Sequence, residues 1–246
     1  DIKTAVVVSP LPEELMAGMI CFSVPQQGNG EFSLPPVLNE DIAYILFTSG
    51  STGVPKGVMV TYLNLENFIE WFTSRPAIAA LYPHAVLNQA QFSFDLSVAD
   101  LYYTLYIGCT LELLQEGIPA SAGASRAELA IMTPSYADCC LLDECFAARA
   151  LPCLQTIFFC GEPLRGSTVR RLWQRFPGLR IINAYGPTEA TCAISSAEIT
   201  PDLAAQEVLP IGRESGEAVD ITLSAENRIC LQGTRVVAGY LNGACF

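Results

Sequence analysis

The chain has 246 residues, 51% of them apolar, which is enough for a sizeable core in one large domain or two small ones. The charged fraction of 15% excludes a disordered chain, and the net charge of −12 argues against a general binder of nucleic acids or anionic membranes. No apolar run reaches the roughly 18 residues that a membrane span needs, and the first residues lack the pattern of a signal peptide, so we expect neither.

The first predicted elements are two strands and an amphipathic helix. Residues 44–47 form an apolar run that is typical of a buried strand, and residues 58–60 form a second one. Asn64 is expected to be the N-cap of the helix that follows. Four apolar residues then recur at the spacing of one helix face, namely Leu65, Phe68, Ile69 and Phe72.

The middle of the chain continues this alternation of short apolar strands and helices. Strands are expected at 86–88, 110–114, 129–132, 156–159 and 180–182. One helix presents Val98, Leu101, Tyr102 and Leu105 on its apolar face, a second covers 136–146, and a third presents Val169, Leu172, Trp173 and Phe176.

This order predicts an α/β fold with a mostly parallel sheet and helices on its faces. After residue 200 the pattern changes to short strands, at 221–223 and 228–231, which predicts a small β-rich subdomain. We therefore expect an α/β core over 1–200 and a β-rich subdomain over 201–246. Residues 24–40 and 115–126 are expected to be loops.

The ten cysteines form neither a CxxC pair nor a zinc-binding pattern, and His84 is the only histidine. Many of the cysteines lie in apolar runs, as Cys160 does in the run 157–160. This pattern favours buried, reduced thiols in a cytoplasmic protein. The alternative is an extracytoplasmic protein with disulfides, which the missing signal sequence disfavours.

Residues 48–57, TSGSTGVPKG, lie between the first two predicted strands and combine glycines, hydroxyls and one lysine. The backbone N–H groups of a glycine-rich turn can converge on an anion, and hydroxyls and a lysine add further donors. The loop differs from a Walker A motif because Gly57, rather than Ser or Thr, follows Lys56. Its composition predicts a phosphate-binding loop, with a flexible surface connection as the alternative.

Three further stretches carry candidate functional groups near predicted strand ends, where open α/β sheets bind ligands. Residues 183–189, NAYGPTE, offer an aromatic ring, a hydroxyl and a carboxylate. Residues 92–98, FSFDLSV, place Asp95 among apolar residues just before a helix. Residues 159–163, FCGEP, end another strand with a glycine and an acid.

Together these four stretches resemble the adenylate-forming ligase superfamily, and over 41–246 they are most similar to the amino-acid adenylation domains of nonribosomal peptide synthetases and their stand-alone relatives. FSFDLSVADLY, TPSYADCCLLDECF, FFCGEPL and NAYGPTEAT resemble the D-alanine–carrier-protein ligases in particular. The resemblance implies that the chain is a partial core of such a ligase. The implied reaction uses ATP and Mg²⁺ to convert a small amino acid to aminoacyl-AMP, releasing pyrophosphate. The acyl group then passes to the phosphopantetheine thiol of a carrier protein.

The resemblance also assigns residues to the nucleotide. The ATP phosphates would be held by Thr48, Ser49, Gly50, Ser51, Thr52, Gly53 and Lys56, although Lys56 has a solvated surface lysine as its alternative. Adenine and AMP would be contacted by Gly161, Glu162, Asn183, Ala184, Tyr185, Gly186, Pro187 and Thr188. Glu189 would bind Mg²⁺. The alternative for Tyr185 is an ordinary strand-end aromatic, and for Glu189 an acid at a helix N-terminus.

The amino acid would be held by Asp95, which the resemblance pairs with the substrate's α-ammonium group. A carboxylate among apolar residues needs a partner, and capping a helix that starts near Ser97 is the alternative role. The matching pocket positions are Leu96, Ala99, Ile131, Phe158, Cys160, Ala184, Cys192 and Ala193. These are neutral and imply a small apolar substrate side chain, with simple core filling as the alternative for Cys160 and Cys192.

The sequence also departs from the family pattern. The first part of the N-terminal core is not matched, and the chain stops soon after 233–241, before the ribose-binding Asp, the hinge and the mobile C-terminal domain with its catalytic Lys. We therefore expect the isolated chain to be impaired in turnover. Two other functions stay open: a nucleotide-binding module that has lost catalysis, and an acyl- or aryl-CoA ligase, against which Asp95 argues.

Overall fold

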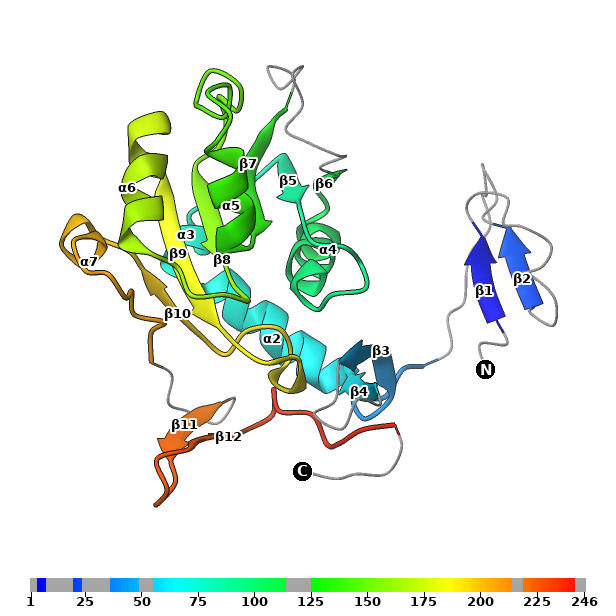
Figure 1. Cartoon of the computed structure of the whole chain (residues 1–246). Coiled ribbons are helices and arrows are strands. Elements are labelled where there is room, and N and C mark those ends of the chain that lie inside the picture. Colours follow the sequence, from blue (N-terminus) through cyan, green and yellow to red (C-terminus); the bar gives the residue numbers. More distant parts are fainter. Residues whose placement is uncertain are drawn as a thin grey trace. The chain divides into compact units, whose positions relative to one another are not determined.

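The computed structural model describes residues 4–7, 20–23, 36–48, 55–113, 125–213 and 219–241 (Figure 1). The chain divides into two compact units, Asp1–Val37 and Leu38–Phe246, each held together by its own internal contacts. In the first unit, β1 (Thr4–Val7) pairs in parallel with β2 (Ile20–Ser23). All further elements belong to the second unit.

The second unit is built on a six-stranded sheet with the order β10-β9-β8-β7-β5-β6. Its strands are β5 (Ala85–Asn88), β6 (Thr110–Leu113), β7 (Ala127–Met132), β8 (Thr156–Phe159), β9 (Arg180–Tyr185) and β10 (Ser195–Glu198). Only β10 runs antiparallel to its neighbour; the other pairs are parallel. The prediction of an α/β fold with a mostly parallel sheet is confirmed.

Helices cover both faces of this sheet (Figure 1). The helices are α2 (Tyr62–Ser74), α3 (Pro76–Ala79), α4 (Leu96–Ile107), α5 (Pro134–Cys140), α6 (Gly166–Arg175) and α7 (Pro201–Ala204). Along β8, Ile157 and Phe159 pack with α5 and α6, whereas Phe158 packs with α2 and α4. Strands buried on both faces need continuous apolar runs, which explains why their sequences show no alternation.

Two small antiparallel sheets complete the described fold. The hairpin of β3 (Ile42–Thr48) and β4 (Lys56–Thr61) brackets the glycine-rich loop, and β11 (Asp220–Leu223) pairs with β12 (Ile229–Gln232) as the short strands after residue 200 predicted. The expected strand at 44–47 is present, but the expectation that it is buried is wrong, because within the described residues β3 pairs only with β4 and Phe47 is 61% exposed.

The start of α2 also differs from the prediction. Thr61, not Asn64, is the N-cap, and the two residues form a reciprocal capping box in which Thr61 Oγ1 accepts from the Asn64 N–H. The sequence T-x-x-N permits either residue to begin the helix, because both side chains can accept backbone hydrogen bonds. The predicted apolar face of α2 is confirmed as buried.

Three further boundaries or faces were predicted incorrectly. In α4 the buried face contains Leu96, Ala99 and Tyr103, whereas Leu105 is 67% exposed. This helix is apolar nearly all round, so periodicity cannot select its face. The helix expected at 136–146 ends at Cys140, and β9 continues through Tyr185 rather than ending at 182.

The cysteines from Cys109 to Cys230 are free thiols, but only Cys140, Cys160 and Cys192 among them are buried. The expectation of generally buried cysteines therefore holds in part. The loops expected at 24–40 and 115–126 lie mostly outside the described residues. Within the described part of the chain, no helix combines the length and apolarity required to cross a membrane.

Candidate functional site

Three of the four predicted functional stretches lie at one edge of the six-stranded sheet. Parallel strands β5, β7, β8 and β9 share an orientation, so the residues that follow their carboxyl ends gather along the same edge. Asp95 follows β5, Gly161 follows β8, and Thr188 follows β9. This edge is the candidate site.

Asp95 and Thr188 are in direct contact at this edge. Thr188 Oγ1 donates a hydrogen bond of 2.8 Å to Asp95 Oδ2. Asp95 occupies the N-cap position of α4, yet its side chain makes no capping hydrogen bond. Its side-chain partner is therefore Thr188, and the backbone N–H of Leu96, at the start of α4, also favours the ionised carboxylate.

The electrostatic surroundings of Asp95 favour a cation. Burial raises the pKa of Asp95, the hydrogen bond from Thr188 opposes that rise, and the nearby carboxylate of Glu189 adds to it. A positively charged group beside Asp95 would reverse the effect, because it stabilises the ionised carboxylate. The arrangement can thus hold an ammonium group.

The eight predicted pocket residues share one buried cluster between the sheet and helices α2 and α4. They are Leu96, Ala99, Ile131, Phe158, Cys160, Ala184, Cys192 and Ala193. Cys160 Sγ lies 3.7 Å from the carbonyl oxygen of Cys192, and burial raises the pKa of the Cys160 thiol to about 12, so this wall is neutral. The same burial fits simple core filling, so contact with a substrate stays a prediction.

Asp100 is a buried acid that sequence reasoning missed. It is 0% exposed, and Asn88 Nδ2 donates to its Oδ2 at 2.7 Å. Burial raises the pKa of Asp100 to about 7, against the opposing hydrogen bond from Asn88. An acid within the apolar helix sequence LSVADLYYTLYI was the available signal.

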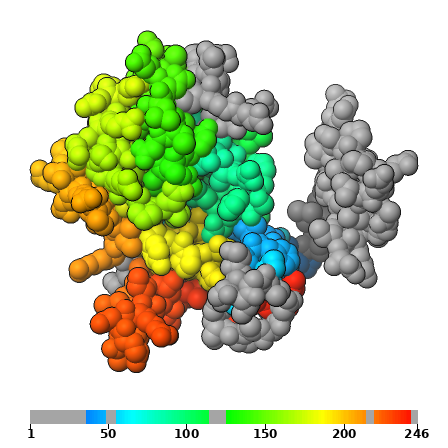
Figure 2. All heavy atoms as spheres, viewed as in Figure 1, coloured from blue at the N-terminus to red at the C-terminus, as the bar shows by residue number. Residues whose placement is uncertain are grey.

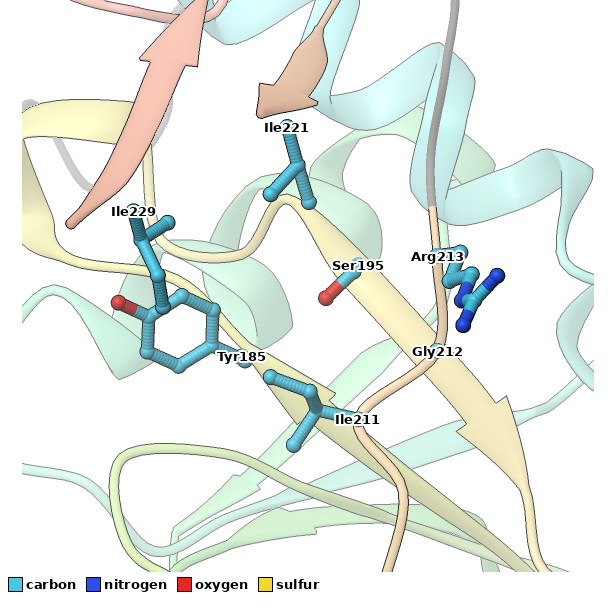
Figure 3. A pocket seen from close by; sticks show the side chains of 7 residues that line it. All are labelled: Tyr185, Ser195, Ile211, Gly212, Arg213, Ile221 and Ile229. Carbon is cyan, nitrogen blue, oxygen red and sulfur yellow. The ribbon is translucent and has the colours of Figure 1, made fainter. Parts of the chain in front are cut away.

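The stretch 183–189, which the sequence predicts to contact the nucleotide and is here called the nucleotide motif, lies on β9 and the turn that follows it. Asn183 Nδ2 donates to the Pro210 carbonyl at 2.9 Å, and Pro187 precedes a short 3₁₀ helix, η2 (Thr188–Ala190). Tyr185 lines a cavity of about 410 Å³ between β9, β10 and the small sheet (Figure 3). The other lining residues are Ser195, Ile211, Gly212, Arg213, Ile221 and Ile229. Figure 3 shows the ring of Tyr185 and the guanidinium of Arg213 on opposite sides of this cavity, with Ser195 and Ile211 between them.

The second stretch assigned to adenine is ordered by contacts with α5. Gly161 adopts φ +94°, a conformation that favours glycine. Glu162 accepts hydrogen bonds from the backbone N–H of Ser135 at 2.9 Å and from its hydroxyl at 2.7 Å. Glu162 therefore binds the first turn of α5, and its place beside the base stays a prediction.

Tyr240 connects the predicted metal ligand to the glycine-rich hairpin. Its hydroxyl donates to Glu189 Oε1 at 2.8 Å, and Lys56 Nζ lies 5.1 Å from the centroid of its ring. Thr48 and Lys56 are paired where β3 ends and β4 begins. Ser49, Gly50, Ser51, Thr52 and Gly53 lie outside the described residues. Sequence reasoning assigned no role to Tyr240.

Within the described residues, no group of three or more His, Cys, Asp or Glu side chains is placed to hold a metal ion. Glu189 is the one predicted magnesium ligand, so protein atoms alone do not build a cage there. Mg²⁺ in nucleotide sites is commonly held by one or two carboxylates together with phosphate oxygens. A single carboxylate oriented by Tyr240 fits that pattern.

Comparison with known proteins gives a match over nearly the whole chain. The sequence model of the AMP-binding enzyme family matches residues 4–241. D-alanine–D-alanyl carrier protein ligase of Bacillus licheniformis is 39% identical over 226 residues, covering 83% of this chain and 44% of that protein. The protein of the same name from Lactiplantibacillus plantarum is 37% identical over 265 residues, covering 99% of this chain and 50% of that protein. The chain spans about half the length of these relatives.

Solved structures share the fold. The Vibrio cholerae adenylation domain AlmE, in complex with glycyl-adenosine-5′-phosphate, has a TM-score of 0.75 at 24% identity and matches 98% of this chain and 50% of its own. O-succinylbenzoate coenzyme A synthetase of Bacillus subtilis, in complex with ATP and magnesium ion, also has a TM-score of 0.75, at 16% identity, over 98% of this chain and 52% of its own.

Proposed function

Because this chain belongs to the AMP-binding enzyme family, we propose that it is part of a ligase that activates a small amino acid as its adenylate. ATP is the second substrate and pyrophosphate the leaving product. D-alanine is the proposed amino acid, since the relatives at 37–39% identity are D-alanine–D-alanyl carrier protein ligases. The proposed acceptor is the phosphopantetheine thiol of a carrier protein, and the proposed location is the cytoplasm.

The observation that carries this proposal is the hydrogen bond between Thr188 and Asp95. This contact supports the proposal because it joins the residue proposed to bind the amino group to the residue proposed to bind the α-phosphate. An amino acid held there by its ammonium would present its carboxylate toward a nucleotide on β9. Such proximity of two reactants is a large part of what an enzyme contributes to a bimolecular step.

The proposed reaction forms one bond to the α-phosphorus and breaks another. A carboxylate oxygen of the amino acid attacks the α-phosphorus of ATP, the bond from that phosphorus to the bridging oxygen breaks, and pyrophosphate leaves with the electron pair. Asp95 holds the ammonium group, Thr188 donates to the α-phosphate, and Tyr185 lies against the base. Residues 48–56 bind the β- and γ-phosphates, where donors stabilise the charge that develops.

Glu189 is the proposed residue for Mg²⁺, with phosphate oxygens as the other ligands. When bound, Mg²⁺ would supply neutralising charge to the phosphates. The hydroxyl of Tyr240 holds one oxygen of Glu189 and so orients the carboxylate. Lys56, over the ring of Tyr240, adds positive charge on the same side.

The proposed substrate is small because the eight residues of the proposed wall, from Leu96 to Ala193, are uncharged and buried. A larger side chain would have to displace Cys160, Cys192 or neighbouring wall residues. A charged side chain would meet no opposite charge in the wall.

The test is amino-acid-dependent exchange of pyrophosphate into ATP by the longest protein that contains this chain. The panel is D-alanine, L-alanine, glycine, serine, proline and a fatty acid. We expect exchange with D-alanine or another small amino acid and none with the fatty acid. Exchange with the fatty acid alone would favour an acyl-CoA ligase, and ATP binding without any exchange would favour a non-catalytic nucleotide-binding module.

A further inference from the structure

Arg235 is a buried cation beside the candidate site. Its side chain is 1% exposed, and its Nη1 and Nη2 donate to the carbonyl oxygens of Ala193 at 3.0 Å and Ile194 at 3.2 Å. The guanidinium also lies 4.5 Å from the ring centroid of Trp71 in α2. The planar guanidinium group can donate to two adjacent carbonyl groups and stack on an aromatic ring at the same time. The ammonium group of a lysine cannot do both. Burying such a charge is costly unless its donors are satisfied.

The carbonyl groups that Arg235 binds belong to the turn 191–194, between η2 and β10. Thr191 and Cys192 in this turn have φ values of +54° and +69°, a region that disfavours residues with a Cβ, and β-branched ones most. Such conformations persist only where the surroundings hold them. Thr191 Oγ1 donates to the Arg235 carbonyl oxygen at 2.7 Å, so Arg235 holds the turn through both its main chain and its side chain.

This turn forms one wall of the predicted amino-acid pocket. Cys192 and Ala193 are buried with Leu96 and Ala99. A Cβ at Gly186 would lie 2.5 Å from Ala193 Cα and 2.7 Å from the Cys192 carbonyl oxygen, so the turn and the nucleotide motif are in backbone contact. In Figure 2 the orange-red segment that carries Arg235 lies against the yellow β9–η2 region. A shift of the turn therefore reshapes the pocket.

We infer that Arg235 is a positioning residue that sets the size limit of the amino-acid pocket. This inference rests on the proposed function, because it takes the cluster around Cys192 and Ala193 to be the substrate wall. Arg235 does not reach the pocket itself; it fixes the carbonyl groups of Ala193 and Ile194 and thereby the depth of the wall. The C-terminal segment 233–237 thus takes part in substrate selection from outside the sheet.

The test compares Arg235→Met with Arg75→Met. Arg75 stacks on the same Trp71, at 4.9 Å, and donates to the Trp71 carbonyl and the Ser74 hydroxyl, both in α2, so it serves as a matched control. The probes are stable sulfamoyl-adenosine analogues carrying alanyl or valyl groups, with AMP as a nucleotide-only probe. Isothermal titration on the folded chain gives three dissociation constants for each variant.

A tight wall should discriminate against the larger valyl group by about tenfold or more per extra methylene group. We expect Arg235→Met to reduce the preference for alanyl over valyl at least tenfold while the AMP dissociation constant changes less than twofold. Arg75→Met should keep the wild-type preference. Arg235→Lys keeps the positive charge but not the planar guanidinium group. We expect its unfolding temperature to be closer to that of the wild type than the unfolding temperature of Arg235→Met is. We also expect it to lose the preference for the alanyl over the valyl probe.

An unchanged preference in Arg235→Met would overturn the inference. So would an equal loss of affinity for all three probes with a lower unfolding temperature, because that is the mark of a purely structural residue. If Arg235→Met does not fold, Arg235→Lys tests the inference instead, through its preference for alanyl over valyl and its dissociation constant for AMP. A wild-type chain that binds neither AMP nor the alanyl probe would instead contradict the proposed function.

Discussion

The hydroxyl of Thr188 donates its hydrogen bond to Asp95 Oδ2 at 2.8 Å, which links the start of α4 to the turn after β9. A threonine hydroxyl has one proton to donate. Thr188 can therefore serve Asp95 or a phosphate oxygen, but not both at once. When it turns to phosphate, Asp95 loses its side-chain donor and keeps only backbone donors, so a cation beside the carboxylate becomes more favourable.

This competition predicts that the nucleotide and the amino acid strengthen each other's binding. We expect the ATP analogue AMPPNP to tighten D-alanine binding by about fivefold or more, within the usual range of coupling energies. Thr188→Val, which has no proton to exchange, should lower this factor toward one, whereas Thr188→Ser should retain it. Titration of D-alanine with and without AMPPNP measures the factor, and equal coupling in the Val and Ser variants would contradict the account.

The buried acid Asp100 should make stability fall as pH rises. Burial raises its pKa from 3.8 in the unfolded chain to about 7 in the folded one, so between these values the folded state binds more protons. Stability is then highest near the lower pH and is lost as pH rises through about 7, by up to about 4 kcal/mol for a shift of this size.

The Asp100→Asn variant isolates this contribution. Its amide oxygen can still accept from Asn88, but it has no proton to lose. We expect urea denaturation to show a smaller loss of unfolding free energy between pH 5 and pH 8 in the variant than in the wild type. Parallel pH profiles would show that Asp100 is not the titrating group.

The contact between Gly186 and the turn 191–194 should tolerate no side chain. A Cβ at Gly186 would meet Ala193 Cα at 2.5 Å, and backbone atoms cannot move aside as a flexible side chain can. We expect Gly186→Ala to lower the unfolding free energy by about 3 kcal/mol or more.

Gly178→Ala is the control for Gly186→Ala. Gly178 has φ +82°, but a Cβ added there would meet no atom of the described residues within 4 Å, so only backbone strain of about 1–2 kcal/mol applies. Urea denaturation of both variants gives the comparison. A cost for Gly186→Ala no larger than that for Gly178→Ala would mean that the turn is not packed against the motif as described.

The sequence predicted the sheet well because its strands are short apolar runs between turn residues, as at 86–88 and 156–159. It misjudged features that depend on distant partners. Nothing local shows that β4 is the one described partner of β3, or which side of the uniformly apolar α4 faces the core. Local motifs were enough to place the candidate site at the sheet edge.

The same limit applies to single residues of the site. Asp95 was recognised as an acid that needs a partner, but that this partner is Thr188 follows only from the fold. Arg235 lies in a glycine- and threonine-containing stretch that is typical of a surface turn, and its burial comes from Trp71 on another element. Tyr240 likewise acquires its role only through contact with Glu189.

Asp95 is proposed to bind the ammonium group of an amino acid beside the nucleotide. The most direct measurement titrates the chain with alanyl and propionyl sulfamoyl-adenosine, which differ only in the amino group. We expect wild type to prefer the alanyl probe by about 2–5 kcal/mol, at least thirtyfold, and Asp95→Asn to lose this preference. The exposed-site control Asp202→Asn should behave as wild type. Equal binding of both probes by wild type, or a preference retained in Asp95→Asn, would contradict the account.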